Sequence, residues 1–272
     1  STMIPDQQFL SQEQVATTVL TLADDAQAKI LNGKVIPGDR VFYAVKSHIR
    51  SSVPKVEKNN LDGMKFHSST GTSDGGWICT GDHYSARTGD NFSGVIEDAG
   101  GLRTEVGQEA DLFIHFTGGL TATIGSNFSK LTELSRDEWN KLVDQFINIP
   151  AAVAQEALKH FVPGGSDDPR KFKDAKGRII IIGPALPAGK KISGHERAKV
   201  EVFRGALRPF ATTINQELSD VLKSNIRVFL ILPGTVDGKE PSNENIMNTI
   251  NYLMTDDAAS SSEVIFCPDE TR

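Results

Sequence analysis

The sequence predicts an α/β fold in which helices cover both faces of a doubly wound, mostly parallel sheet. Short apolar runs at 110–119, 177–184 and 226–234 each end in glycine or proline, as buried strands do. Long helical segments at 134–162 and 196–223 separate them. Strands that alternate with helices of this length form parallel sheets through right-handed crossovers. The predicted architecture is therefore of the Rossmann type.

The two long helices and the central strand carry clear local signals. Ser135 and Glu138 form a capping box at the start of the first helix, because the side chains of such a pair bond each other's backbone amides. The strand at 177–184 contains four consecutive isoleucines, and a strand that is apolar on both faces is typical of a buried parallel sheet. We expect Pro209 to bend the second helix.

The two ends of the chain are expected to complete the sheet. Ser242 caps a predicted helix over 243–255, and a last strand covers 262–267. The first third has three candidate strands, joined by polar, Gly-rich segments in place of long apolar helices: 39–47, 63–69 and 75–82. We therefore expect shortened βαβ helices there. Residues 1–35 are predicted to be a helical extension, and residues 36–272 a single domain.

The composition is that of an ordinary globular protein. Hydrophobic residues make up 38% and charged residues 24% of the 272. The net charge of −6 disfavours a nucleic-acid or anionic-membrane surface, since both need a basic face. No apolar run approaches the ~20 residues of a membrane span. Cys79 and Cys267 are the only cysteines, so we expect no disulfide framework and a cytoplasmic location.

From residue 110 onward, the order and spacing of the motifs resemble the short-chain dehydrogenase/reductase (SDR) family. "DLFIHFTGG" stands where that family has a strand ending in Asn-Asn-Ala-Gly, and "GRIIIIGP" is similar to its strand ending in the catalytic serine. "IRVFLILPG" contains the family's Pro-Gly, here Pro233 and Gly234. The resemblance covers residues 110–267. It implies a single SDR-like domain that assembles as dimers or tetramers.

The resemblance places the family's four catalytic residues on positions that have lost their chemistry. Its asparagine falls on Phe146, its serine on Pro184, its tyrosine on Val200 and its lysine on Arg204. Phenylalanine, proline and valine have no side-chain proton to exchange, so general acid–base catalysis by this route is excluded. The sequence also has no tyrosine between residues 85 and 251. We therefore predict no catalytic residue at these positions.

The cofactor positions of the family are altered as well. If 41–52 is the first strand and its phosphate-binding turn, Lys46, Arg50 and Ser52 replace the turn's glycines. Their side chains would fill the space of a pyrophosphate. Asp82 corresponds to the family's aspartate near the adenine. We expect no cofactor in this chain, and NAD(P) in a partner subunit.

Several polar residues are weaker candidates for a site. Tyr84, in the loop after the third candidate strand, and His115 are each weaker catalytic candidates. A polar surface loop and a hydrogen-bonded structural histidine are the simpler interpretations. Lys190 and Lys191 would suit a phosphate, although a solvated pair is favoured. Six histidines without short spacing predict no metal site.

Both long helices keep full apolar faces although the catalytic positions are lost. In the resembled family these two helices form a four-helix interface with a second subunit. The candidate interface residues are Phe203, Leu207, Phe210 and Ile214. A large apolar face that is kept on a fold without its catalytic residues favours assembly with a second subunit. Part of this stripe must nevertheless face the chain's own sheet.

We therefore interpret the chain as a non-catalytic subunit that pairs with an active short-chain dehydrogenase in a hetero-dimer or hetero-tetramer. The pattern resembles family members built from an active and a degenerate subunit, such as the alcohol dehydrogenases of β-oxidation-like benzylsuccinate breakdown. That resemblance implies a hydroxyacyl or ketoacyl substrate for the complex. Two alternatives stay open: an active NAD(P)-dependent ketone or alcohol oxidoreductase with atypical residues, and a scaffold that binds a small molecule.

Overall fold

The centre of the sheet consists of strands whose side chains are buried on both faces. β5 (Leu112–Phe116), β6 (Lys176–Ile182) and β7 (Asn225–Ile231) lie side by side and parallel. All of β5 and the last four residues of β6 and of β7 are buried, as expected for a parallel sheet that is covered on both sides. The three central strands predicted from the apolar runs are confirmed.

The computed structural model of the chain describes residues 49–50, 53–71, 77–79, 96–104, 108–117, 131–162, 168–173, 175–184, 194–234, 243–261 and 264–268. All of them belong to one compact unit, His48–Arg272. The helical extension predicted over 1–35, its boundary with the domain, and the strand predicted at 39–47 lie outside the described residues and stay predictions.

The described strands form one sheet in the order β1-β8-β7-β6-β5-β2-β3, and β4 pairs with β2 off this path. The outer strands are β1 (Ile49–Arg50), β2 (Lys65–Gly71), β3 (Trp77–Cys79), β4 (Leu102–Arg103) and β8 (Ile265–Phe266). Every described pair is parallel except that of β2 with β3. The fold is therefore α/β with a Rossmann-type, mostly parallel sheet, as predicted.

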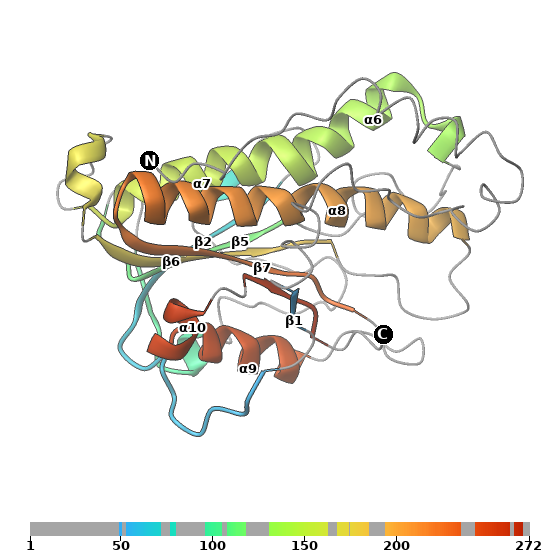
Figure 1. Cartoon of the computed structure of the whole chain (residues 1–272). Helices are drawn as coiled ribbons and strands as arrows, with labels where there is room; N and C mark the ends of the chain where they lie inside the picture. Colours follow the sequence, from blue (N-terminus) through green and yellow to red (C-terminus); the bar gives the residue numbers. More distant parts are fainter. Residues whose placement is uncertain are drawn as a thin grey trace, which may run out of the picture. The chain divides into compact units, whose positions relative to one another are not determined.

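Helices cover both faces of this sheet (Figure 1). α6 (Arg136–Val143), α7 (Ile149–His160) and α8 (Gly194–Gln216) lie on one face, and α9 (Asn243–Leu253) and α10 (Asp256–Ser260) lie on the other. Each face has its own apolar core, since burial of each helix stripe against the strands removes its apolar side chains from water. None of the described helices combines the length and the apolar character that a bilayer crossing requires.

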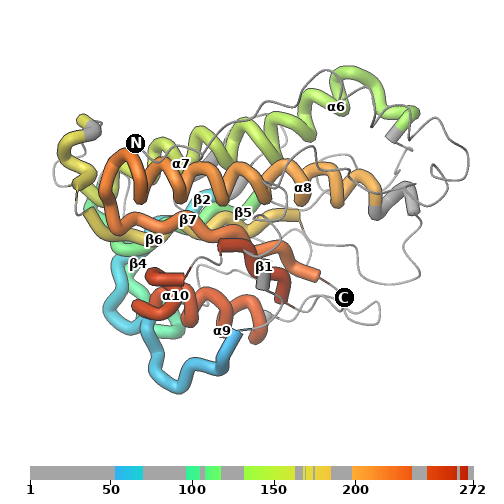
Figure 2. The backbone as a smooth tube through the Cα atoms, in the orientation of Figure 1, coloured from blue at the N-terminus to red at the C-terminus, as the bar shows by residue number. Residues whose placement is uncertain are grey.

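The first long helix consists of α6, the π-helical turn η2 (Asp144–Asn148) and α7, which Figure 2 traces as one path. Ser135 caps α6 as predicted: its hydroxyl accepts from the amide of Glu138, and its own amide donates to the Glu138 carboxylate. In η2 the amide of Ile149 donates to the carbonyl of Asp144, five residues back. We attribute this wider turn to Pro150, which lacks the amide hydrogen that a regular α-helix uses at that point.

The second long helix is α8, which continues through Pro209 and ends in the π-turn η4 (Glu217–Val221). Val200, Phe203, Leu207 and Leu218 from its predicted apolar stripe are buried. Two short 3-10 helices complete the first face, η1 (Leu131–Glu133) before α6 and η3 (Pro169–Phe172) before β6.

The strands nearest the amino terminus depart from the prediction. The segment expected at 63–69 forms β2, which pairs in parallel with β5. The segment expected at 75–82 forms β3, but β3 is antiparallel to β2, and only residues 72–76 separate the two. A parallel neighbour needs a crossover of a dozen or more residues. The shortened βαβ unit predicted here is therefore replaced by a hairpin.

Candidate functional site

The positions on which the resemblance places the family's catalytic residues lie near the ends of the central strands. Pro184 follows β6, Phe146 lies in η2, and Val200 and Arg204 lie one turn apart on α8. In open parallel sheets, ligands bind outside these carboxyl ends of the strands. A ligand of this fold is therefore expected at this edge of the sheet.

Phe146 and Val200 are fully buried in a closed apolar cluster with Leu142 and Phe203. The ring centroids of Phe146 and Phe203 are 5.2 Å apart, and the ring of Trp139 lies 5.6 Å from that of Phe203. Tilted aromatic pairs at these separations are favourable beyond their buried area. The two positions on which the resemblance places the family's asparagine and tyrosine thus contribute to packing, and neither side chain has a donor or an acceptor.

Arg204 is a fully buried cation that binds two strand ends. Its Nη1 donates to the carbonyl of Pro233 at 2.6 Å and to the carbonyl of Pro184 at 3.2 Å. The carboxylate of Glu201, one turn back on α8, lies 3.9 Å from its Nε. A guanidinium offers five donors in a fixed fork. Here that fork joins the ends of β6 and β7 to α8, in the place where the resemblance puts a lysine.

Gln145 is a buried polar residue of this region that the sequence did not single out. Gln145, beside Phe146 in η2, is buried and donates to the carbonyl of Thr117 at 2.6 Å. The amide and the hydroxyl of Thr117 both donate to the carbonyl of Ile182. These bonds connect η2 with the ends of β5 and β6. A glutamine inside an otherwise apolar helix stripe is the only signal in the sequence that pointed to it.

His115 is a buried histidine in β5, and its Nδ1 lies 2.8 Å from the hydroxyl of Ser69 in β2. Both side chains are fully buried within the sheet. The bond supports the interpretation of His115 as a hydrogen-bonded structural histidine. Tyr84, the other weak candidate, lies outside the described residues, as do Lys190 and Lys191.

The predicted phosphate-binding turn needs a correction. β2, and not β1, pairs with β5 in the sheet, and β1, which contains Arg50, pairs with β8 towards the opposite edge. Arg50 therefore does not stand at a phosphate-binding turn. The chain leaves β2 at residue 71 and returns as the antiparallel β3. Lys46, Ser52 and Asp82 lie outside the described residues.

Lys199 is a second fully buried cation on α8. Hydrogen bonds from the Ser135 side chain and amide lower the pKa of Glu138, and the charge of Lys199 acts in the same direction. The lysine thus connects α8 electrostatically with the start of α6. Among the residues that the structure describes, no group of three or more His, Cys, Asp or Glu side chains is arranged to hold a metal ion.

The predicted interface stripe divides into two parts. Phe203 and Leu207 are buried in this chain's own cores, so their assignment to an interface was wrong. A helix stripe wide enough to cover a sheet looks the same in sequence as one that meets a partner. Phe210 and Ile214 are only partly buried, at the outer edge of the core. They stay candidates for an interface.

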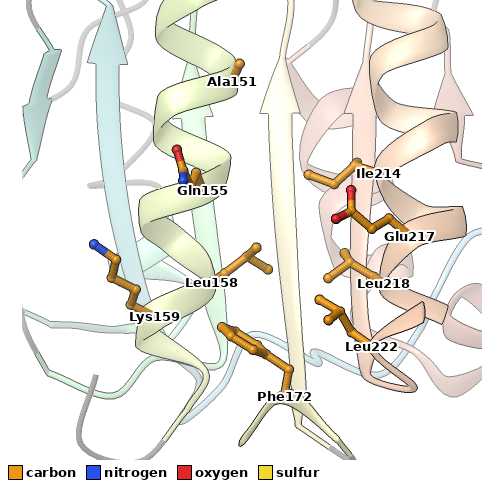
Figure 3. Close-up of a pocket in the computed structure, with 9 residues that line it drawn as sticks. All are labelled: Ala151, Gln155, Leu158, Lys159, Phe172, Ile214, Glu217, Leu218 and Leu222. Carbon is orange, nitrogen blue, oxygen red and sulfur yellow. The ribbon is translucent and has the colours of Figure 1, made fainter. Parts of the chain in front are cut away.

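An open groove of about 440 Å³ lies between the outer faces of α7 and α8. Its floor is apolar, and Leu158 of α7 faces Leu218 of η4 across it (Figure 3). Gln155, Lys159 and Glu217 supply polar groups at its sides. The complete lining consists of Ala151, Gln155, Leu158, Lys159, Phe172, Ile214, Glu217, Leu218 and Leu222.

Comparison with known proteins agrees with the α/β fold of the Rossmann type. No family model matches the chain. A candidate short-chain alcohol dehydrogenase from Sinorhizobium meliloti has a similar structure, with a TM-score of 0.50 and 15% identity over 78% of this chain and 96% of that one. A short-chain dehydrogenase from Mycobacterium smegmatis gives a TM-score of 0.49 and 12% identity over 82% of this chain and 98% of that one.

The sequence is also similar to curated proteins, over part of its length. Uncharacterized oxidoreductases from several strains of Staphylococcus aureus are 30% identical to it over 125 residues, which is 44% of this chain and 47% of theirs. The chain thus spans about half the length of the curated relatives it matches.

Proposed function

We propose that this chain is a non-catalytic, SDR-like subunit that assembles with an active short-chain dehydrogenase. The partner supplies the NAD(P) site and the acid–base residues, and this chain supplies a rigid surface. On this proposal the relatives that are named oxidoreductases share its fold, and the chemistry belongs to the partner. The hydroxyacyl or ketoacyl substrate inferred by resemblance belongs to the same complex.

The observation that carries the proposal is that Arg204 already binds two backbone carbonyls at the strand ends. Its Nη1 is engaged with the carbonyls of Pro184 and Pro233, so the cation at the lysine position is committed to the strand ends. Removing a buried charge from such bonds costs several kcal/mol. A cofactor ribose would have to compete with those carbonyls, and the apolar cluster around Phe146 beside it has no group to protonate a carbonyl substrate.

The hairpin of β2 and β3 supports the part of the proposal that concerns the loss of the cofactor site. Dinucleotides place their pyrophosphate on the amino end of a helix that follows the first strand of a Rossmann unit. In this chain β2 is followed by β3 after residues 72–76. Five connecting residues leave no length for that helix.

The outer faces of α7 and α8 are the surface that we propose for assembly. Phe210 and Ile214 are partly exposed there, and the groove between the helices is apolar at its floor and polar at its sides. Interfaces of this kind combine an apolar centre with a polar rim. A helix of the partner that inserts an apolar side chain between Leu158 and Leu218 would fit this surface.

Two measurements test the proposal: cofactor binding by the lone chain, and the mass of the complex that the chain forms. We expect isothermal titration of NADH and NADPH into the purified chain to give no measurable binding, and native mass spectrometry of the protein from its source to show a complex with a second, active chain. Gln155→Arg combined with Glu217→Arg should weaken that complex at least about tenfold, because two cations would enter the groove. Asn245→Arg on α9, on the opposite face of the sheet, is the matched control and should leave the complex intact.

Three results would contradict the proposal or favour one of its alternatives. Tight binding of NAD(P)H by the lone chain would contradict the loss of the cofactor site. Turnover of a β-ketoacyl thioester with NADH by the lone chain, abolished in Tyr84→Phe, would favour the alternative of an oxidoreductase with atypical residues. A thermal-shift response to nucleotides or acyl-CoAs without turnover would favour the small-molecule scaffold.

A further inference from the structure

Two arginine side chains leave the sheet next to each other, on the face that α9 and α10 cover (Figure 1). Arg178 of β6 and Arg227 of β7 are register partners in adjacent parallel strands, and such strands lie about 4.8 Å apart. Alternate residues of a strand share a face, and Ile180 and Phe229, two positions further on, belong to the core that packs against α9 and α10. We call Arg178 and Arg227 the arginine pair.

Each guanidinium of the arginine pair binds the end of a helix. Nε of Arg178 donates to the carbonyl of Leu253, the last residue of α9, at 3.3 Å. Nη2 of Arg227 donates to the carbonyl of Ser261, the residue that follows α10, at 2.5 Å. Carbonyls at the carboxyl end of a helix carry partial negative charge and attract cations. The arginine pair thus fastens α9 and α10 to the strands.

Positive charge predominates at the arginine pair. Like charges directly opposite each other on neighbouring strands are destabilising, and among the described residues no carboxylate forms an ion pair with either arginine. Burial lowers the pKa of both guanidinium groups, and the charge of Arg227 lowers the pKa of Arg178 further, while Asp256 of α10 opposes this effect. Lys176, two residues before Arg178 and on the same face of β6, adds an exposed cation.

The arginine pair also has hydrogen-bond donors that no described residue accepts. Nε of Arg227 is buried without an acceptor among the described residues, and a buried donor of this kind is costly to leave unpaired. Nη1 of Arg178 donates to the carbonyls of Gly177 and Asn225 at 3.0 and 3.4 Å, whereas its Nη2 and Nη1 of Arg227 bond to no other described residue. Both side chains are only partly buried, so a small ligand can reach them from solvent.

We propose that the arginine pair binds a phosphate group. A guanidinium presents its donors in a rigid fork that matches phosphate oxygens, and a tetrahedral phosphate has enough acceptor oxygens to bond two forks at once. A carboxylate, with two oxygens, would leave more of these donors unpaired. The negative charge of a phosphate also offsets the repulsion between Arg178 and Arg227. A bound phosphate would therefore strengthen the attachment of α9 and α10 to the sheet.

This site is separate from the place where the fold would bind a dinucleotide. Ligands of open parallel sheets bind outside the carboxyl ends of the strands, whereas Arg178 and Arg227 are the third residues of β6 and β7, near the amino ends. The arginine pair also lies on the other face of the sheet from the groove between α7 and α8. The phosphate site therefore depends neither on NAD(P) nor on the proposed assembly.

Isothermal titration of inorganic phosphate into the full-length chain tests the site, with sodium chloride added to hold the ionic strength constant. We expect saturable binding, and at least about tenfold weaker binding by Arg227→Met, which keeps an apolar stem and removes one fork. The midpoint of thermal unfolding should rise with phosphate, because a ligand that binds only the folded chain stabilises it. Glycerol 3-phosphate is titrated in parallel: tighter binding than that of phosphate indicates a phosphate ester as the ligand, and equal or weaker binding indicates the free anion.

The matched control is Lys171→Met, which removes one exposed positive charge from η3, on the other face of the sheet. It changes the net charge as Arg227→Met does and should leave phosphate binding unchanged. Equal weakening in the two variants would show unspecific attraction of anions, and the absence of saturable binding by the unmodified chain would show that water serves these donors; either result overturns the proposal. If Arg227→Met does not fold, Arg227→Lys, which keeps the charge and loses the fork, decides: unchanged affinity contradicts the site.

Discussion

The region from β5 to β8 and the segment 53–104 belong to the same sheet but are stabilised in different ways. In the first region, strands and helices alternate, and apolar side chains fill a core on each face. The second region contributes chiefly Leu61, Phe66 and Ile96 to one of those cores. Side-chain hydrogen bonds to backbone groups also hold residues 58–60 of that segment.

Two of those bonds join the segment to α9, and a third lies within the segment. The amide of Asn60 donates to Oδ1 of Asn251 at 2.7 Å, Nδ2 of Asn251 donates to the carbonyl of Lys58 at 3.0 Å, and Nδ2 of Asn59 donates to the carbonyl of Ala99 at 2.6 Å. The difference teaches that a segment of a Rossmann-type domain can be held to distant elements by polar contacts as well as by its apolar side chains, at a smaller gain per contact.

Phe146→Ala should have the largest effect, because it opens the cluster on which the β5–β8 region depends. We expect a loss of about 3–5 kcal/mol in the free energy of unfolding, which is usual for a buried phenylalanine, measured by urea denaturation. Trp139→Ala, at the exposed rim of the same cluster, is the control and should cost clearly less. Equal costs for the two would mean that the cluster is not closed.

Arg204→Met tests whether the buried cation stabilises the ends of β6 and β7. The substitution keeps much of the volume but leaves the carbonyls of Pro184 and Pro233 without this donor, so we expect a loss of about 3 kcal/mol. Arg170→Met removes an exposed arginine that is paired with Asp168 and should leave the denaturation midpoint unchanged. A midpoint that is also unchanged in Arg204→Met would show that the guanidinium is dispensable there.

Asn251→Ala addresses the polar contacts of the other region. It removes the bonds to the amide of Asn60 and the carbonyl of Lys58, and we expect a loss of about 1–2 kcal/mol in the same urea experiment. Asn248→Ala, whose side chain accepts one longer bond of 3.4 Å from the amide of Val56, should cost less. If the order were reversed, the contrast between the two regions would need another basis.

Glu97→Gln should have the smallest effect. Its ion pair with Arg103 is partly exposed to solvent, and pairs of this kind contribute at most about 0.5–1 kcal/mol. We expect a change of about 0.5 kcal/mol or less in the free energy of unfolding, and a smaller difference from the unmodified chain in high salt, where exposed charges are screened. A cost above about 2 kcal/mol would assign the pair a structural role like that of Arg204.

The sequence predicts the β5–β8 region well because its signals are local. Runs of apolar residues that end in Gly or Pro, and the capping box of Ser135 and Glu138, depend only on neighbouring positions. The hairpin of β2 and β3 also has a local signal, Gly75-Gly76 in a short connection. The prediction treats that stretch as a loop between parallel strands, because strands and helices alternate in the rest of the chain.

The contacts at the candidate site were harder to predict than the fold. They join side chains to backbone groups or to distant elements, so they leave no motif in the sequence. Arg204 binds two backbone carbonyls, and the sequence records no carbonyl partner. Arg178 and Arg227 belong to strands that meet only in the folded sheet. The assignment of Phe203 and Leu207 to an interface failed for a related reason, since helical periodicity gives the apolar face and not the surface that covers it.

The pairing of β1 with β8 has a consequence for the order of folding. Ile49 lies opposite Ile265 at this edge of the sheet, and the bond between Asn60 and Asn251 spans 191 positions. Contacts so remote along the chain form late, because a long loop must close first. During synthesis, residues 49–60 leave the ribosome long before their neighbours exist. A nascent chain would therefore carry this segment undocked until the last helix and strand had emerged, a window in which a chaperone has access to it.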